Sequence, residues 1–324
     1  MLSRGTKVKP KMTAADATRV LGVTLQATHK KLKTKGLPFE KSQNRVYFGF
    51  ETSKPLFEFP FRKQIVACQI VKGGTGKTSL LFALAVRANL YGAKVLCIDM
   101  DQQGNLTQAF CANPESQPCM VDILQENLPT KTAIVPILPG LDLLPSRIEN
   151  AVLDNTIMLK RLPLDRVYKD RFEALRSQYD LMLIDCPPSL GQSVAAVALA
   201  VDLVIAPVTP EKFSLSGLEV TVNELHNLEE NYKCKVPIRV VINKYDNRTV
   251  LSHEVLSTLM KHPAYGEVLF KSYIRISQDF PNSVAKRQTI FDTLAASTAK
   301  EDIDLLTQEL LEIGNFAMVQ RQVG

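Results

Sequence analysis

The chain has 324 residues, of which 45% are hydrophobic, enough for one large domain and a smaller unit. It contains no run of eighteen apolar residues and no apolar segment of a signal peptide near its start, so we expect a soluble, cytosolic protein that does not act at a membrane. Its six cysteines form no CxxC or CxxH pair, which disfavours zinc and iron–sulfur sites and indicates a reducing compartment.

The positive charge of the chain is concentrated at its front. The net charge is +6, but residues 1–63 hold 14 Lys and Arg against 4 Asp and Glu, about +10, whereas the remainder holds 25 against 29, about −4. A basic segment ahead of a nearly neutral core favours a polyanion as partner, although basic arms that are merely solvated are common.

Residues 1–54 are predicted to form a small helical module. Thr13 begins a short helix that ends at Gly22, and Thr24 caps a second helix over 25–35. Two short helices joined by a glycine turn are the outline of a helix-turn-helix, or of a winged one if a strand follows.

The polar residues of this module suggest DNA binding. Lys30 and Lys33 on the second helix suit phosphates and base edges, and Arg45 lies on a candidate wing strand over 44–50. The alternative is a basic helical hairpin that packs on the main domain or forms a dimer contact. Residues 55–63, with two prolines and three phenylalanines over 55–62, are predicted to be an extended linker.

The stretch KGGTGKTS follows an apolar strand over 64–71 and precedes an apolar helix over 80–90. Strand, glycine turn and helix are the context of a loop whose backbone N–H groups hold phosphates. In such a loop Lys77 reaches the β- and γ-phosphates and Thr78 ligates Mg²⁺. The predicted nucleotide-binding residues of the loop are Lys72, Gly73, Gly74, Thr75, Gly76, Lys77, Thr78 and Ser79.

Two further strands end in carboxylates. The strand 94–98 runs into DMDQQGN, with Asp99 and Asp101, and the strand within DLMLIDCPPS ends at Asp185. Because the carboxyl ends of parallel strands meet at one edge of a sheet, these groups are expected beside the phosphate loop, where Mg²⁺ and an attacking water bind.

These motifs together resemble the deviant Walker A family, which contains ParA-type partition ATPases, the septum-placing Min ATPase and the nitrogenase iron protein. The resemblance covers residues 65–293, with Gln102 where the family usually has proline. It implies ATP and Mg²⁺ as cofactors, with Thr78, Asp99 and Asp185 around the metal. It also implies that Asp101 orients the hydrolytic water, and that Lys72 and Lys77 act on the phosphates. Lys72 opens the loop and is expected to reach the nucleotide of a facing subunit.

The later motifs leave alternatives open. Asn243 begins NKYD, which fits the guanine motif of GTPases, but in partition ATPases an Asn or polar residue here meets adenine, so ATP is favoured. By resemblance Arg275, Lys286 and Arg287 are candidates for non-specific DNA contacts, the alternative being ordinary exposed basic residues. The helix predicted over 298–319 opens with acidic residues and lacks a basic amphipathic end.

Alternating strands and helices, with short strands also expected within 136–144 and over 273–276, predict an α/β fold with a doubly wound, mostly parallel sheet over 64–324. The resemblance implies a partition ATPase that forms an ATP-dependent homodimer and binds DNA. Its ATP hydrolysis is expected to be stimulated by a centromere- or cargo-binding ParB-type adaptor. We would expect it in the cytoplasm of a bacterium, associated with the nucleoid. The alternatives are a nucleotide-regulated transcriptional repressor, a Min-like positioning ATPase and, least favoured, a nitrogenase-like reductase.

Overall fold

A seven-stranded sheet forms the centre of the computed structural model, which describes residues 9–42, 44–110, 112, 117–211 and 214–314. Its strand order is β10-β9-β4-β8-β5-β7-β6, and every neighbouring pair is parallel except β6 with β7. The mostly parallel sheet predicted from the sequence is therefore confirmed. The strands are β4 (Gln64–Cys68), β5 (Val95–Asp99), β6 (Val135–Leu138), β7 (Leu141–Leu144), β8 (Leu181–Asp185), β9 (Leu203–Val208) and β10 (Ile238–Ile242).

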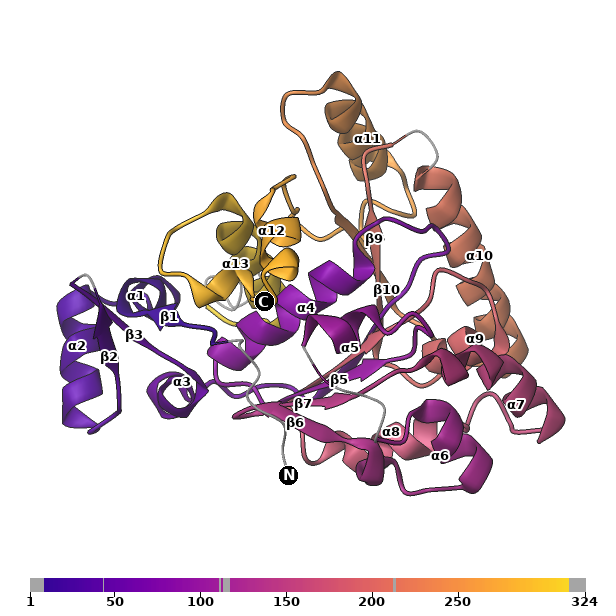
Figure 1. Cartoon of the computed structure of the whole chain (residues 1–324). Coiled ribbons are helices and arrows are strands. Elements are labelled where there is room, and N and C mark those ends of the chain that lie inside the picture. Colours follow the sequence, from indigo (N-terminus) through magenta and orange to yellow (C-terminus); the bar gives the residue numbers. More distant parts are fainter. Residues whose placement is uncertain (1–8, 43, 111, 113–116, 212–213, 315–324) are drawn as a thin grey trace.

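Helices cover both faces of this sheet, as Figure 1 shows. Because successive side chains of a strand point to opposite faces, β4 contacts both helical layers. Val66 and Cys68 pack with the helices of one face, and Ile65 and Ala67 with those of the other. The first face carries α4 (Lys77–Leu90), α5 (Asn105–Ala109), α12 (Asp279–Ala285), η3 (Ile290–Asp292) and α13 (Thr298–Leu311). The remaining helices are α6 (Met120–Glu126), η1 (Thr130–Ala133), η2 (Ile148–Val152), α7 (Leu153–Leu159), α8 (Lys169–Arg176), α9 (Gln192–Ala198), α10 (Ser214–Tyr232) and α11 (Val250–Lys261).

The basic front segment folds as short helices and a small antiparallel sheet of order β1-β3-β2. The predicted caps are present: Thr13 and Asp16 form a capping box, Gly22 ends the first helix in the left-handed region, and Thr24 caps the second. The elements are β1 (Met12–Thr13), α1 (Ala14–Leu21), α2 (Leu25–Thr34), β2 (Glu40–Ser42), β3 (Arg45–Phe48) and α3 (Phe50–Phe57).

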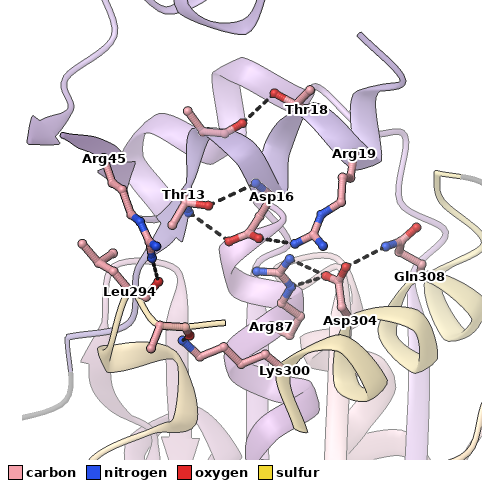
Figure 2. A network of polar contacts seen from close by, with 12 residues as sticks. Thr13, Asp16, Thr18, Arg19, Arg45, Arg87, Leu294, Lys300, Asp304 and Gln308 are labelled. Carbon is pink, nitrogen blue, oxygen red and sulfur yellow. Dashed lines mark hydrogen bonds and ion pairs between the residues drawn. The ribbon is translucent and has the colours of Figure 1, made fainter. Parts of the chain in front are cut away.

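This N-terminal module, residues 9–57, shares its hydrophobic core with the central domain. Met12, Leu56 and Phe57 belong to the same buried cluster as α4 and α13, and the Phe57 ring meets Tyr91 edge to face at 5.9 Å. A polar network joins the same parts (Figure 2): Arg87 of α4 pairs with Asp304 of α13, close to Asp16 of α1. The module is thus packed onto the core rather than tethered beside it.

Four expectations about the chain need correction. Residues 55–57 are not extended, because α3 continues through Pro55 to Phe57, and Lys31 and Lys35 of α2 donate hydrogen bonds to the carbonyls of its last turn. Residues 135–144 form a hairpin of two strands rather than one strand, with Gly140 in the turn.

The other two corrections concern the end of the chain. Residues 273–276 make only an isolated bridge, between Tyr245 and Arg275, rather than a strand. The predicted last helix ends at Leu311, where Glu312 adopts a left-handed conformation, and the remainder of that prediction, 315–319, lies outside the described residues, as do residues 1–8. In the part of the chain that the structure describes, no helix is long and apolar enough to span a bilayer.

Candidate nucleotide-binding site

The phosphate loop lies between β4 and α4 and borders a cavity of about 680 Å³ at the carboxyl edge of the sheet. Gly74 and Gly76 adopt φ values of +75° and +84°, which glycine reaches without a steric penalty. At Gly76 a side chain is excluded twice, since its Cβ would also lie 2.5 Å from Nδ2 of Asn243. The cavity is lined by Gly73, Gly74, Gly76, Lys77, Thr78, Ser79, Phe82, Asp101, Asn105, Gln108, Ala109, Ala112, Pro188, Val284 and Arg287.

Two residues that follow β10 support the loop from behind. Nδ2 of Asn243 donates to the carbonyl of Thr75 at 2.7 Å, and Nζ of Lys244 donates to the carbonyl of Gly74 at 2.8 Å. Asn243 was expected to meet the base, but here its amide holds the loop and does not line the cavity. Its role in this structure is to fix the shape of the phosphate-binding backbone.

Lys77 is the buried cation of the cavity. It is 7% exposed, and among the described residues its Nζ has only two long contacts, 3.4 Å each, to the carbonyls of Ile70 and Lys72. Because an ammonium group has three donors and these contacts are weak, Lys77 can turn to a stronger acceptor such as a phosphate oxygen.

Thr78 lines the cavity, and the buried Asp185 lies beside it. The Thr78 hydroxyl donates to Oδ2 of Asp185 at 2.6 Å, while Oδ1 of Asp185 is buried with no partner within the described residues. Burial raises the pKa of Asp185 to about 8, and the neighbouring Asp99 adds to the shift. An unsatisfied carboxylate oxygen beside a threonine hydroxyl fits Mg²⁺, which prefers oxygen ligands and would lower this pKa again.

Asp99 is enclosed by donors of its own chain. Its Oδ2 accepts from the backbone and the hydroxyl of Thr107 at 2.9 and 2.7 Å, and its Oδ1 accepts from the backbone N–H of Asp101 at 3.2 Å. It is fully buried, and burial raises its pKa to about 6. Asp99 was expected around the metal, in support of its shell. Because both of its oxygens accept hydrogen bonds from the chain, it is better suited to position Asp101 than to ligate Mg²⁺ itself.

Asp101 itself lines the cavity, as predicted for a residue that orients water. Its Oδ1 accepts from the backbone N–H of Gln103 at 3.0 Å, and its carbonyl accepts from the Ser146 hydroxyl at 2.6 Å. The second carboxylate oxygen accepts no hydrogen bond from the described residues. The turn that carries Asp101 is therefore held from two sides while one oxygen stays available.

Lys72 does not line the cavity of its own chain. Its Nζ pairs with Oε2 of Glu211 at 2.5 Å, and the Lys72 side chain is 23% exposed. The Lys72 side chain therefore points away from its own cavity, as expected for a lysine that reaches a facing subunit. Its ion pair with Glu211 was not predicted from the sequence.

The residues expected to touch DNA fall into three groups: exposed lysines, arginines engaged within the chain, and an arginine that lines the cavity. Lys30 and Lys33 are exposed on the outer face of α2 and have no partner within the described residues, and Lys286 is exposed at the end of α12. Arg45 and Arg275 are engaged within the chain. Arg45 donates to the carbonyl of Leu294.

Arg275 is bound by carboxylates of α13. Its Nε lies 3.0 Å from Asp302, and its Nη2 lies 2.8 Å from Glu301. Such paired guanidinium groups are poor candidates for phosphate contacts, because a new partner would have to replace an existing one. Arg287 differs from all of these, since it lines the nucleotide cavity.

The guanine-motif aspartate is also occupied. Both oxygens of Asp246 accept hydrogen bonds from the Arg248 guanidinium, at 2.9 and 2.8 Å, and these bonds lower the pKa of Asp246 to about 2. Reading a guanine base needs this carboxylate as an acceptor for base N–H groups. The arrangement therefore favours ATP over GTP.

Sequence reasoning missed four supporting residues: Thr107, Ser146, Glu211 and Lys244. Ser146 follows the carboxyl end of β7, and Lys244 is the second residue of NKYD, so both carried a positional signal. Thr107 and Glu211 carried none that links them to their partners, because each meets a residue that only the tertiary fold brings near.

Comparison with known proteins identifies the family of the chain. The family model described as an AAA domain matches residues 63–238, more than half of the chain. The chain is 31% identical over 222 residues to the chromosome partitioning protein ParA of Caulobacter vibrioides, covering 66% of this chain and 80% of that one. It is 29% identical over 246 residues to the cell division protein PomZ of Myxococcus xanthus, covering 74% and 75%.

Solved structures share the fold. The ATP complex of a Cyanothece McdA variant superposes with a TM-score of 0.69 at 20% identity, over 79% of this chain and 98% of that one. Cobyrinic acid a,c-diamide synthase of Mycobacterium smegmatis, with an ATP analogue and magnesium, gives 0.64 at 22% identity, over 77% and 95%. With the family match and the ParA relative, the conclusion is direct: the chain belongs to the AAA-domain family of ParA-type partition ATPases, enzymes that use ATP and Mg²⁺.

Proposed function

We propose that this ATPase segregates DNA, through an ATP-dependent dimer whose two subunits each complete the other's site. The observation that carries the proposal is the position of Lys72. It belongs to the phosphate loop but lies outside the cavity of its own chain, in a partly exposed pair with Glu211. A lysine placed there can reach the nucleotide of a second subunit that faces the same cavity edge.

Different residues of the site bind the phosphates, bind Mg²⁺ and orient the attacking water. Backbone N–H groups of residues 73–79 and the Lys77 ammonium bind the phosphates, since both place positive charge at the start of α4. Thr78 and Asp185 would hold Mg²⁺, which neutralises phosphate charge when bound. Asp101 orients the attacking water with its available oxygen.

Dimer formation and DNA binding follow from charge. A terminal phosphate contacted by Lys72 of the facing subunit holds two chains together, and its loss on hydrolysis lets them separate. DNA is held through phosphates, hence without sequence preference and with strong salt dependence. A ParB-type adaptor stimulates the otherwise weak hydrolysis and so sets where in the cytoplasm the protein leaves the nucleoid.

The test compares two variants that break the same ion pair. Lys72→Ala should bind a non-hydrolysable ATP analogue with Mg²⁺ as the wild type does, yet remain monomeric by light scattering, because the contact across the dimer is lost. Glu211→Gln removes the pairing carboxylate but keeps the lysine, and should still dimerise. An analogue-dependent dimer of normal affinity in Lys72→Ala would contradict the proposal.

A second candidate is a nucleotide-regulated repressor that acts on its own operon, with the N-terminal module reading the operator. The feature that favours it is the outer face of α2, where Gln26, Lys30 and Lys33 are exposed. Footprinting on the DNA upstream of the coding region discriminates: a protected, sequence-specific segment supports repression. A Min-like role at membranes is disfavoured, because α13 is buried against α4.

A further inference from the structure

The nucleotide cavity has a second cation that the phosphate-loop motif does not contain. Arg287 follows α12, far along the chain from the loop, and lines the cavity together with Val284. Within the described residues its guanidinium has no carboxylate or carbonyl partner. Because the guanidinium N–H groups of Arg287 have no acceptor in the described part of the protein, they are available to donate hydrogen bonds to an anionic ligand in the cavity.

The charges around the cavity make this position significant. Two other basic residues of the loop region are engaged by the protein: Lys72 pairs with Glu211, and Lys244 donates to the Gly74 carbonyl. Lys77 and Arg287 are thus the only basic side chains among the described lining residues, and Asp101 adds a negative charge. Arg287 is therefore the one described lining side chain besides Lys77 that can add positive charge to the phosphates from within the same subunit.

The backbone holds Arg287 in an unusual conformation. Its φ is +54°, in the left-handed region that costs a bulky residue energy relative to glycine. The Arg287 N–H bonds to the carbonyl of Val284 at 2.9 Å, which closes α12 and fixes where the side chain leaves the backbone. A glycine would suit this turn better, so the turn itself does not require arginine.

We propose that Arg287 binds the phosphates of ATP, so that the end of α12 contributes to the site together with the phosphate loop. The inference rests on the proposed assignment of this cavity as the ATP site. A guanidinium can donate two parallel hydrogen bonds to phosphate oxygens, and the exposed Arg287 side chain can turn to form them. The role replaces the contact with DNA that the sequence suggested for this residue.

The experiment measures binding of a non-hydrolysable ATP analogue with Mg²⁺ to the full chain, without DNA, by calorimetry. Arg287→Gly removes the guanidinium and relieves the turn. It should raise the Kd about ten-fold without lowering the melting temperature of the nucleotide-free protein. Arg287→Lys keeps the positive charge but cannot donate two parallel hydrogen bonds, so its Kd should lie between those of the wild type and Arg287→Gly. Lys286→Ala removes the adjacent basic residue, which does not line the cavity, and should bind as the wild type does.

Three results would overturn the inference, and they are distinguishable. If Arg287→Gly binds within two-fold of the wild type while Lys77→Ala loses binding, Arg287 has no part in a site that is otherwise correctly placed. If Lys77→Ala binds normally, the cavity is not the ATP site, and the proposed function loses its basis together with the role of Arg287. A Lys286→Ala defect equal to that of Arg287→Gly would show a general effect of charge and would also refute the specific contact.

Discussion

Asp185 is a carboxyl group that the fold stabilises in its protonated form until a metal binds. Its burial and the neighbouring Asp99 raise the pKa to about 8, from an ordinary value of 3.8. Because the pKa of Asp185 is higher in the folded than in the unfolded state, the protonated side chain makes its full contribution to folding stability below about pH 4. This contribution is lost as the pH rises from about 4 through 8. The nucleotide-free protein should therefore lose stability across a pH range in which most carboxylates no longer titrate.

Replacing Asp185 with Asn, which mimics the protonated acid, tests this. In metal-free buffer the wild type should lose on the order of 4 kcal/mol relative to Asp185→Asn between pH 5 and pH 8.5, since about three pH units of this range lie below the folded-state pKa and each corresponds to about 1.4 kcal/mol. Denaturant unfolding at the two pH values gives the difference. Added Mg²⁺ with nucleotide should stabilise only the wild type. Parallel stability profiles for the two proteins would show that Asp185 is ionised throughout.

At the scale of elements, α4 connects two parts of the molecule. Its first turn borders the nucleotide cavity, and Arg87 near its end lies 2.6 Å from Asp304 of α13, inside the network of Figure 2. The Arg87 side chain is only 3% exposed, and Tyr91 and Gln308 complete the hydrogen bonds around Asp304. Removing one partner of such a pair destabilises the fold more than replacing both, because it leaves a single buried charge without compensation.

Asp304→Ala should accordingly reduce the free energy of unfolding by about 3–5 kcal/mol, measured by urea denaturation. The matched control is Glu173→Ala, which breaks the exposed pair with Arg176 on α8 and should cost less than about 1 kcal/mol. If the two variants lost similar stability, the network would be no more important than a surface pair.

The sequence was most informative where one element determines the outcome. The strands that end at the phosphate loop, Asp99 and Asp185, the helix after the loop and the caps at Thr13 and Thr24 depend on local patterns, and the structure contains them. Contacts between distant elements were not predictable. The partners of Arg275 lie on α13, and that of Asn243 on the phosphate loop, so neither residue type nor spacing could reveal that these side chains were already engaged.

The same limit applied to the boundary of the front module. Two prolines within 55–60 suggested an extended linker, but Pro55 lies inside α3, whose last carbonyls are covered by lysines of α2. A proline inside a helix removes one N–H donor and crowds the carbonyl four residues earlier. Packing against α4 and the Phe57–Tyr91 contact offset this cost in α3. Tertiary packing, rather than local preference, decided this segment.

For the whole molecule, the shared core changes how DNA binding should be tested. Removing residues 1–63 would expose Tyr91 and its buried neighbours. Loss of DNA binding in such a truncated chain could then result from misfolding rather than from loss of a DNA contact. Point variants on the outer face of α2 avoid this, because Lys30 and Lys33 are exposed and hold nothing together within the described residues.

The double variant Lys30→Ala/Lys33→Ala should weaken binding to duplex DNA and reduce the slope of log K against log salt by about 2, since each phosphate contact contributes about 0.9. Lys235→Ala is the control: its side chain is 88% exposed on a different part of the surface, and it should leave affinity and slope unchanged. Anisotropy titrations of labelled DNA at several salt concentrations provide both quantities. An unchanged slope in the double variant would mean that DNA does not approach the molecule from α2, and that the positive charge of the front segment serves packing instead.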